Sequence, residues 1–173
     1  MADYQQLTHE FHPVFDKNSR ILILGTFPSV KSREQHFYYG HPQNRFWKVL
    51  ASITKEPLPT TVSEKKQFLL TWHIAVWDVI QSCEIIGSSD SSIRNVIPAD
   101  IPNLLAQTSI TSIFGNGNKA CELFEKYTAP TLLQFPELNK IQKLPSTSPA
   151  NASWSLDRLT TYWQEKLIPY LTI

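Results

Sequence analysis

The run Arg20-Ile21-Leu22-Ile23-Leu24-Gly25 limits the fold of this chain more than any other feature. A continuous apolar run that stops at a glycine is typical of a parallel strand covered on both faces. Further strands are expected at residues 74–77 and 111–114, with weaker candidates at 131–135 and 140–144. Because segments with helical spacing separate these runs, the sequence predicts a three-layer α/β/α sandwich around a central, mainly parallel four-stranded sheet.

The helices between these strands are expected from apolar residues that recur three or four positions apart. One of them should begin at Pro42, which suits a first helical turn, and should bury Phe46, Leu50 and Ile53. Ser155 is expected to cap the last helix. The remaining helices are expected at residues 63–70, 101–107 and 119–126, and polar connectors at 56–61, 87–95 and 145–153.

A chain of 173 residues, with 42% hydrophobic and 18% charged residues, is long and apolar enough to form one globular domain. We expect an N-terminal tail at residues 1–18 and a single domain at residues 19–173. The first residues lack the apolar core of a signal peptide, and no apolar run approaches the roughly 18 residues that a membrane span needs. These features predict a soluble, cytoplasmic protein, and a monomer is the default expectation. Cys83 and Cys121 lack CxxC spacing and are expected to be reduced thiols.

Charge and motif content argue against several classes of function. A formal net charge of +1 gives no overall attraction to nucleic acid or to anionic membranes, so anion binding must come from local groups. The five histidines lack a ligand spacing such as HExxH, so neither a metal nor another cofactor is expected. The chain has no GxSxG motif, which argues against an α/β hydrolase, and residue order alone indicates no Ser/His/Asp triad.

Polar residues follow four of the expected strands: the turn at 26–29, Asp78, the segment 115–118 and the loop at 146–149. In open α/β sheets, ligands bind outside the carboxyl ends of the strands, so these segments are expected to form one composite site. Each segment alone is equally consistent with a turn, a connector or a helix entry. The glycines at 115 and 117 do not indicate a phosphate loop, because the lysine that follows precedes Ala instead of Ser or Thr.

Five segments, taken in order along most of the chain, resemble the uracil-DNA glycosylase superfamily. They are GTFPS (25–29), YYGHPQNRFWKVL (38–50), AVWDVI (75–80), FGNGNKA (114–120) and LPSTSPANA (144–152). The aromatic run that begins at Phe37 is the most specific, because the mismatch-specific branch carries a closely similar run. GTFPS is similar to the turn of the hypoxanthine-DNA (deoxyinosine) glycosylase branch, with Phe27 where a water-activating Asn usually stands. Leu144 likewise stands where His or Asn is common, so the resemblance does not imply uracil cleavage by the usual residues.

The resemblance implies a DNA glycosylase that flips out a deaminated base and hydrolyses its N-glycosidic bond, leaving an abasic site. Hypoxanthine is the expected base, with uracil or xanthine second, and damaged DNA is the expected partner. Two alternatives remain open. One is a mismatch-specific uracil/thymine-DNA glycosylase, and the other is a catalytically silent nucleic-acid-binding member of the same fold.

The resemblance also implies roles for individual residues. Tyr39 matches the ring on which the flipped base lies, and Phe27 is expected to border the same pocket. Asn44, placed in the first turn of its helix, is the first choice for holding water or meeting the base, although it could instead tie the loop to the helix. Asp78 stands where pyrimidine-specific relatives place a base-reading Asn, and its carboxylate could accept the N1–H of hypoxanthine or act on water. Asn116 is a further candidate for a contact with the base edge.

Contacts to the DNA backbone are expected from residues near the first and last of these motifs. The uncharged candidates are Ser146, Ser148 and Asn151, and the cationic candidates are Lys31 and Arg45. Because few phosphates would be neutralised, the sequence predicts a moderate dependence of DNA binding on salt.

Overall fold

The computed structural model of the protein describes residues 3–87 and 89–171. At its centre lies a parallel sheet of four strands in the order β3-β2-β6-β7. The strands are β2 (Ile21–Gly25), β3 (Ile74–Asp78), β6 (Ser112–Asn116) and β7 (Gln142–Leu144). Every residue of β2 is buried, as the unbroken apolar run predicts for a strand covered on both faces.

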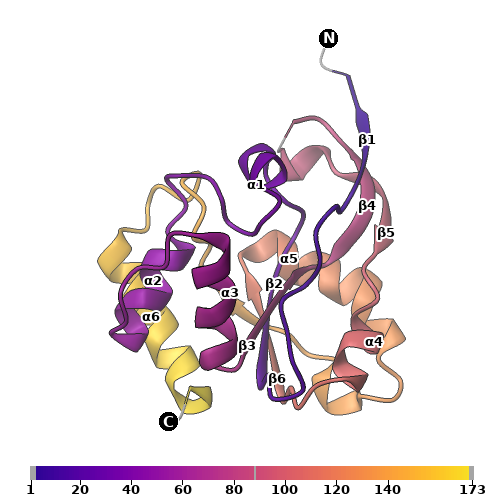
Figure 1. The fold of residues 1–173 in the computed structure, drawn as a ribbon. Coiled ribbons are helices and arrows are strands. Elements are labelled where there is room, and N and C mark those ends of the chain that lie inside the picture. The colour runs from indigo at the N-terminus through magenta and orange to yellow at the C-terminus, as the bar shows by residue number, and fades with distance from the viewer. Residues whose placement is uncertain (1–2, 88, 172–173) are drawn as a thin grey trace.

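Helices cover both faces of this sheet, which confirms the predicted three-layer architecture (Figure 1). One face carries α2 (Phe46–Thr54), α3 (Val62–Thr71) and α6 (Leu156–Leu167), and α6 is followed by a 3-10 turn at Ile168–Tyr170. The other face carries α4 (Ile101–Ala106) and α5 (Asn118–Leu123). Alternation along β2 divides the core, because Ile21 and Ile23 pack on the first face and Leu22 and Leu24 on the second.

Side-chain caps explain where three of the helices begin. Thr61, Asp100 and Ser155 each accept a hydrogen bond from the backbone N–H three residues later, at the start of α3, α4 and α6. The helices predicted at residues 63–70 and 101–107 and the Ser155 cap are therefore confirmed, with ends that differ by one residue.

The helix predicted from Pro42 begins later, at Phe46. The preceding residues form a turn instead. The Asn44 side chain accepts the N–H of Phe46 at 3.0 Å, and the N–H of Arg45 donates to the Thr147 carbonyl at 3.1 Å. These bonds hold the backbone outside the helix, so Asn44 lies just before α2 and not in its first turn.

A second, antiparallel sheet is missing from the sequence-based prediction. It consists of β1 (Gln5–Thr8), β4 (Ile80–Ile85) and β5 (Arg94–Pro98), in the order β1-β4-β5. β4 follows β3 after a single residue, and its Ile80, Cys83 and Ile85 pack into the same core as α4. The apolar run around Asp78 therefore continues into a second strand, whereas the sequence analysis ends it there.

The structure corrects the expectation that residues 1–18 form a tail. Within the described part of this segment, β1 pairs with β4, and Val14 forms a bridge with Val76 of β3. His9 and Val14 are both buried. Figure 1 shows the segment running beside β4 and then along the parallel sheet. Its few apolar residues are too irregularly spaced to reveal this packing in the sequence.

The segment between α5 and β7 also differs from the prediction. Residues 131–135, a weaker strand candidate, form no strand, whereas the other candidate is confirmed as β7. The chain forms a π-helical turn at Phe124–Thr128 and 3-10 turns at Ala129–Thr131 and Pro136–Leu138. Pro130 and Pro136 lack the N–H groups that a ladder needs, so local hydrogen bonds such as that from Leu132 to Ala129 replace it.

Two further helical turns lie outside the predicted elements. α1 (Val30–Gln35) follows the turn after β2, and a 3-10 turn at Asp90–Ser92 lies within the predicted connector at 87–95, of which Ser88 is outside the described residues. Among the residues that the structure describes, no helix is both long and apolar enough to cross a bilayer. Cys83 and Cys121 are free thiols.

Candidate active site

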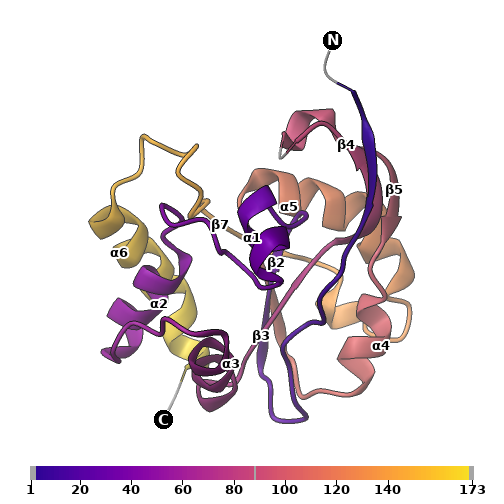
Figure 2. The same cartoon turned by 45° about the horizontal axis from the view of Figure 1, so that its top comes forward.

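A cavity of about 360 Å³ lies at the carboxyl ends of the four parallel strands. Figure 2, in which this edge of the sheet comes forward, shows α1 at the end of β2 and the loop that follows β7. The lining includes residues at all four strand ends and in the loop at residues 36–45, which we call the aromatic loop. Among them are Gly25, Tyr39, Asn44, Asp78, Asn116 and Ser146. The predicted composite site is therefore present, and its volume lies near the lower end of the roughly 300–1,000 Å³ of small-molecule sites.

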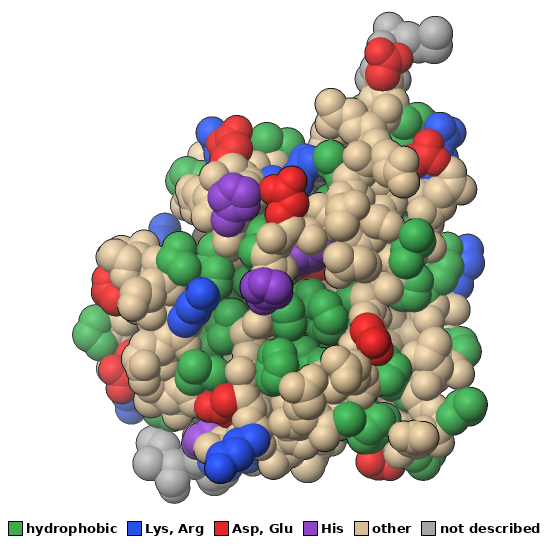
Figure 3. Space-filling model, turned by 45° about the vertical axis from the view of Figure 1, so that its right-hand side comes forward, with side chains coloured by type: hydrophobic (Ala, Val, Ile, Leu, Met, Phe, Trp, Pro, Cys, Tyr) green, Lys and Arg blue, Asp and Glu red, His purple; other side chains and the backbone are tan. Residues whose placement is uncertain are grey.

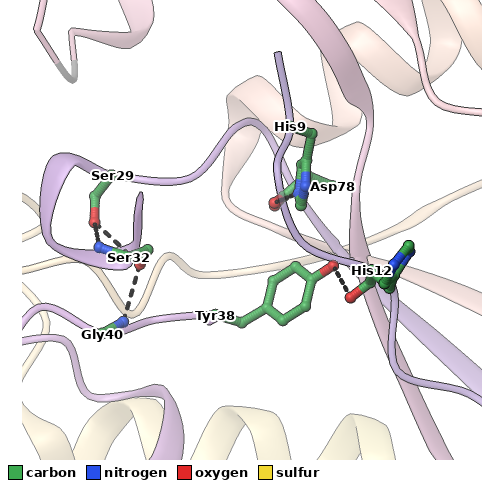
Figure 4. A network of polar contacts seen from close by, with 7 residues as sticks. All are labelled: His9, His12, Ser29, Ser32, Tyr38, Gly40 and Asp78. Carbon is green, nitrogen blue, oxygen red and sulfur yellow. Dashed lines mark hydrogen bonds and ion pairs between the residues drawn. The ribbon is translucent and has the colours of Figure 1, made fainter. Parts of the chain in front are cut away.

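Two hydrogen bonds in series link the turn after β2, through Ser32 of α1, to the aromatic loop (Figure 4). The Ser29 hydroxyl caps α1 by accepting the N–H of Ser32 at 3.2 Å. Ser32 Oγ accepts the N–H of Gly40 at 2.9 Å. Gly40 follows Tyr39 directly, so these bonds hold the two motifs together as one wall of the cavity.

Gly25 allows two polar side chains to lie close to the end of β2 at the cavity. A Cβ atom on Gly25 would lie 2.5 Å from Asp78 Oδ1 and 3.1 Å from the Tyr39 hydroxyl oxygen. Because the first distance is far shorter than a van der Waals contact, any larger residue would displace Asp78. The proximity of Asp78 and Tyr39 to the backbone at this position thus explains the glycine of the GTFPS motif.

Tyr39 reaches the cavity from a strained backbone. Its φ of 54° is left-handed, which costs a residue other than glycine about 1 kcal/mol or more. The ring stacks on Phe46, with ring centroids 4.0 Å apart and an interplanar angle of 20°. The ring is half-buried, but its hydroxyl is fully buried, makes no hydrogen bond of ordinary geometry among the described residues, and interacts with the Asn116 side chain. Burial and then the Asp78 carboxylate raise the pKa of Tyr39 well above its ordinary value, while Asn116 acts in the opposite direction.

A chain of hydrogen bonds fixes the orientation of two amide side chains. The backbone N–H of Thr147 donates to Asn116 Oδ1 at 3.0 Å, so the NH₂ group of Asn116 donates to Thr147 Oγ1, also at 3.0 Å. The Thr147 hydroxyl then donates to Asn44 Oδ1 at 2.8 Å, and the backbone N–H of Phe46 donates to the same oxygen. Because a backbone N–H can only donate, neither amide can be turned around without losing bonds.

The amide oxygen of Asn44 is therefore occupied within the protein, with both of its lone pairs engaged. Asn44 also lines the cavity, and its NH₂ group is the polar group that remains for a ligand. The side chain can thus tie the loop to α2 and donate into the cavity at the same time. Its oxygen is poorly suited to orienting water.

Asp78 is buried at the end of β3 and is held by a histidine from the N-terminal segment (Figure 4). Its Oδ2 lies 2.9 Å from His9 Nε2, and the exposed fractions of the His9 and Asp78 side chains are 1% and 5%. The other oxygen, Oδ1, is the one beside Gly25, and Asp78 lines the cavity. One oxygen is therefore bound to protein while the residue still presents a hydrogen-bond acceptor at the cavity.

Phe27 borders the cavity and also belongs to the core. Its side chain is 9% exposed, and its ring meets the His9 ring edge to face with centroids 6.1 Å apart. Since a phenyl ring has no hydrogen-bonding atom, Phe27 offers a ligand an apolar surface only.

Arg45 points into the loop after β7. Its guanidinium donates to the carbonyls of Thr147, Ser148 and Asn151 at 3.3, 2.8 and 3.1 Å, and to the carbonyl of Trp154. These bonds tie the loop to the start of α2. The guanidinium, which is predicted to contact a DNA phosphate, is instead bonded to four carbonyl oxygens of the protein.

The same loop contains the uncharged candidates for DNA contacts. Ser146 Oγ accepts the N–H of Ser148 at 3.1 Å, and Ser148 Oγ accepts the N–H of Ala150 at 3.2 Å. The hydroxyl hydrogens of both serines are not used in these bonds and can be donated to a ligand. Asn151 instead uses its NH₂ group internally, on the Ser146 carbonyl at 3.0 Å.

Lys31 lies at the rim of the cavity and forms an exposed ion pair with Glu34 at 3.4 Å. Within residues 3–87 and 89–171, no group of three or more His, Cys, Asp or Glu side chains could hold a metal ion.

Sequence analysis misses three residues of this site. His9 is separated from Asp78 by 69 positions and lies in a segment that reads as a tail. Asp90 lines the rim and accepts the Thr26 hydroxyl at 3.2 Å, but no pattern connects the two in the sequence. Thr147 is fully buried, and its place between Ser146 and Ser148 in the LPSTSPANA motif is the one signal that could have revealed it.

Comparison with known proteins identifies the family. The sequence pattern of the Uracil DNA glycosylase superfamily matches residues 12–167, which include the whole parallel sheet and every strand end of the cavity. The chain belongs to the uracil DNA glycosylase superfamily. The resemblance predicted from the five sequence motifs is thereby confirmed.

Individual relatives agree with this assignment. Two proteins named hypoxanthine DNA glycosylase match the chain. The one from Methanosarcina acetivorans is 35% identical over 150 residues, which are 86% of this chain and 90% of the relative. The one from Methanosarcina barkeri is 40% identical over 86 residues, which are 49% of this chain and only 54% of the relative.

A solved structure of another protein has a similar fold. It is an NMR structure of a candidate uracil DNA glycosylase from Methanosarcina acetivorans, with a TM-score of 0.76 and 31% sequence identity. The match covers 92% of this chain and 96% of that one. Family, relatives and fold together support a DNA glycosylase, an enzyme of DNA repair.

Proposed function

We propose that this protein is a monofunctional DNA glycosylase that excises hypoxanthine from deoxyinosine, with uracil and xanthine as secondary bases. The observation that carries the proposal is the combination, around one cavity, of a buried carboxylate acceptor on Asp78 and an oriented amide donor on Asn44. The two Methanosarcina relatives named for hypoxanthine support the same choice of base.

The edge of hypoxanthine matches these two groups. A flipped base is read through its Watson–Crick edge, where hypoxanthine presents the O6 acceptor next to the N1–H donor. In our proposal the Asn44 NH₂ group donates to O6 and the Asp78 carboxylate accepts N1–H. Adenine presents the reverse pattern, an NH₂ donor at C6 and an acceptor at N1. The same two groups therefore reject the undamaged base, because the Asn44 donor would face the NH₂ donor of adenine and the Asp78 acceptor would face the N1 acceptor.

Aromatic rings supply the stacking surface. Tyr39 is proposed to lie under the flipped base, and Phe27 to form an apolar wall beside it. Stacking on an aromatic side chain contributes about 1–3 kcal/mol per base, which offsets part of the few kcal/mol that flipping costs. The contact of Tyr39 with Phe46 on one face keeps the ring in place for a base on the other.

The Asn44 donor also suits the chemical step. Breaking the glycosidic bond leaves positive charge on the sugar and negative charge on the departing base. A donor to O6 meets charge that grows as the bond breaks, so it stabilises the transition state more than the ground state. We assign Asn116 a supporting role, because both ends of its amide are bonded to Thr147.

DNA binding is proposed to rely on few charges. Ser146 and Ser148 donate hydrogen bonds from their hydroxyl groups to phosphates, and Lys31 adds a cation at the rim. Arg45 and Asn151 hold the shape of the loop that carries the serines. The net charge is +1, and Figure 3 shows a face on which acidic and basic side chains are interspersed. We therefore propose a monomeric enzyme of the cytoplasm whose affinity for DNA falls only moderately with salt.

An abasic-site assay tests the proposal. The protein is incubated with duplexes that carry a single deoxyinosine, deoxyuridine, deoxyxanthosine or G·T mismatch, and the products are treated with alkali to break the strand at abasic sites. We expect the fastest strand breakage at deoxyinosine. No breakage with any duplex would overturn the proposal, and breakage at uracil or mismatched thymine alone would favour a mismatch-specific enzyme.

A further inference from the structure

The N-terminal segment contacts Asp78 of the cavity through the side chain of His9. β1 pairs with β4 up to Thr8, and the N–H of His9 donates to the Gln81 carbonyl at 2.7 Å. This pairing fixes the backbone at the position where the imidazole turns inward toward Asp78. His9 precedes the range 12–167 that matches the superfamily, so the family pattern does not account for it.

The imidazole lies in an aromatic environment. Its centroid is 4.6 Å from that of Phe11, 5.8 Å from Tyr38 and 6.1 Å from Phe27. Nδ1 is buried and has no hydrogen-bond partner among the described residues. The contact between Nε2 and Asp78 Oδ2, at 2.9 Å, is thus the polar interaction that holds the ring.

Asp78 depends on this contact in return. A carboxylate that is almost fully buried needs a partner, because burial of an unpaired charge is strongly unfavourable. Within the described part of the chain, His9 is the residue that donates a hydrogen bond to the Asp78 side chain. Oδ2 is bound to His9, and Oδ1 lies beside Gly25. The hydrogen bond from His9, which is not part of the cavity lining, therefore fixes the orientation of the carboxylate.

We infer that His9 is a positioning residue for base recognition, which donates Nε2–H to Asp78 and so directs the free oxygen of Asp78 toward the N1–H of the base. This inference rests on the proposed function and extends it. His9 does not line the cavity and acts only through Asp78. The N-terminal segment is accordingly part of the active site, although it contributes no residue to the pocket wall at this point.

Two substitutions of similar size separate positioning from packing. His9→Gln keeps an N–H donor at nearly the position of Nε2, whereas His9→Leu fills the aromatic environment without a donor. We expect His9→Leu to lower the single-turnover rate of hypoxanthine excision by roughly 10- to 100-fold, the usual cost of losing a residue that orients a site group. His9→Gln should restore the rate to within about threefold of the wild type. Equal losses in both variants would overturn the inference.

His12 offers a matched control in the same segment. Its side chain is exposed, and its role in the core is carried by the backbone carbonyl that accepts the Tyr38 hydroxyl at 3.0 Å. His12→Leu and His12→Gln should therefore leave the rate unchanged. A loss in His12→Leu as large as that in His9→Leu would show that any change in this segment impairs the enzyme, which would contradict a specific role for His9.

A double variant keeps the inference testable if His9→Leu does not fold. In Asp78→Asn no buried charge is left to pair, so adding His9→Leu should lower the rate by less than about threefold further. A further loss of tenfold or more, given as an order of magnitude, would show that His9 acts independently of Asp78 and would overturn the inference.

Binding distinguishes failure of this inference from failure of the proposed function. A 2′-fluoroarabino-deoxyinosine duplex resists cleavage, because fluorine disfavours the oxocarbenium-like sugar cation. Wild-type protein that binds this duplex better than its deoxyadenosine counterpart but cleaves no deoxyinosine would refute only the proposed function. The role of His9 would then be decided by whether His9→Leu, but not His12→Leu, removes that preference. Wild-type protein that neither cleaves deoxyinosine nor prefers this duplex would overturn both.

Discussion

The two polar sides of the cavity are held in place by different means. On one side, Asn44 is fixed by neutral hydrogen bonds from Thr147 and from the backbone of Phe46, and Thr147 is bonded in turn to Asn116. On the other side, Asp78 receives its side-chain hydrogen bond from His9 alone, as far as the described residues show. The first side is a network of neutral groups, and the second is one pair of ionisable groups.

This difference teaches how each side should respond to substitution. A neutral network anchored on backbone N–H groups loses about 0.5–1.5 kcal/mol per hydrogen bond, so its function should decline in steps. A buried charge with a single partner has no other group to replace that partner. One substitution in the pair should therefore cause most of the loss in activity.

Asp78→Asn should have the largest effect. The carboxamide keeps the size of the side chain but can turn an NH₂ group toward the N1–H of hypoxanthine, which places two donors face to face. We expect the single-turnover rate of hypoxanthine excision to fall by about 10³-fold or more, because a site built to hydrogen-bond one pattern strongly rejects its reverse.

The control is Asp157→Asn, which changes an exposed acid in the first turn of α6. Its rate should equal that of the wild type. An Asp78→Asn rate close to the wild-type value would remove Asp78 from base recognition. A similar loss for all substrates, including one without a ring N–H at this edge, would point to the alternative role of activating water.

Asn44→Ala should have the next largest effect. The substitution removes the donor to O6, and the loss of one donor to a developing negative charge lowers the rate by about 10²-fold or more. Gln43→Ala, which truncates the exposed neighbouring amide, serves as the control and should be neutral. Rates are measured under single-turnover conditions with excess enzyme. Full activity in Asn44→Ala would contradict the donor role.

Thr147→Val tests the network behind Asn44. The methyl group keeps the shape of the side chain but leaves the Asn116 NH₂ group without its acceptor and Asn44 Oδ1 with one donor fewer. We expect a loss of stability of about 1–3 kcal/mol and a loss of rate of about tenfold. Urea unfolding and single-turnover rates measure the two effects, with exposed Thr161→Val as control. Lower stability with an unchanged rate would show that the network has no part in orienting Asn44.

Tyr39→Phe should have the smallest effect on activity. The ring supplies the proposed stacking surface, and the buried hydroxyl makes no hydrogen bond of ordinary geometry within the described residues, so the rate should stay within about threefold of the wild type. Removing an unsatisfied hydroxyl should leave stability unchanged or raise it by up to about 1 kcal/mol. Tyr39→Ala, which removes the ring, is the contrasting variant and should lose substrate binding. A large loss of rate in Tyr39→Phe would assign the hydroxyl a role that this account denies it.

Alkaline pH gives a second test of the Tyr39 hydroxyl. Burial and Asp78 raise the pKa of Tyr39 in the folded protein, so the unfolded chain loses this proton first as pH rises above about 10. The free energy of unfolding therefore falls above that pH, and Tyr39→Phe should lessen the fall by up to about 1.4 kcal/mol per pH unit. Urea unfolding between about pH 9 and about pH 11, a range centred on the ordinary tyrosine pKa of about 10, measures the slope. Identical slopes in both proteins would contradict the burial of this hydroxyl.

The parallel sheet could be predicted from the sequence because both faces of its strands are buried. β2, β3 and β6 each read as a short apolar run, and the polar residues after them mark the edge where the cavity forms. The antiparallel sheet could not, because residues such as those of β1 alternate weakly and are mostly exposed. A strand of that kind is stabilised by its partner, which lies far away in the chain.

The site could be predicted in part for the same reason. Asp78 and Asn116 stand at strand ends, so topology alone brings them together. Tyr39 is predicted from the family resemblance, and Asn44 from its place near that ring in the expected first helical turn. The pairing of His9 with Asp78 joins residues 69 positions apart and leaves no local pattern. Sequence also cannot distinguish an arginine that faces phosphate from one that bonds to carbonyl groups, as Arg45 does.

One DNA strand that contains a single deoxyinosine among many deoxyadenosines tests recognition of the base directly. The two bases differ in the donor and acceptor pattern that Asn44 and Asp78 are proposed to read, and the adenines act as internal competitors. After incubation with wild-type protein and treatment with alkali, we expect breakage at deoxyinosine and at least about 10³-fold less at any adenine. An intact deoxyinosine, or breakage at adenines at a comparable rate, would contradict the account.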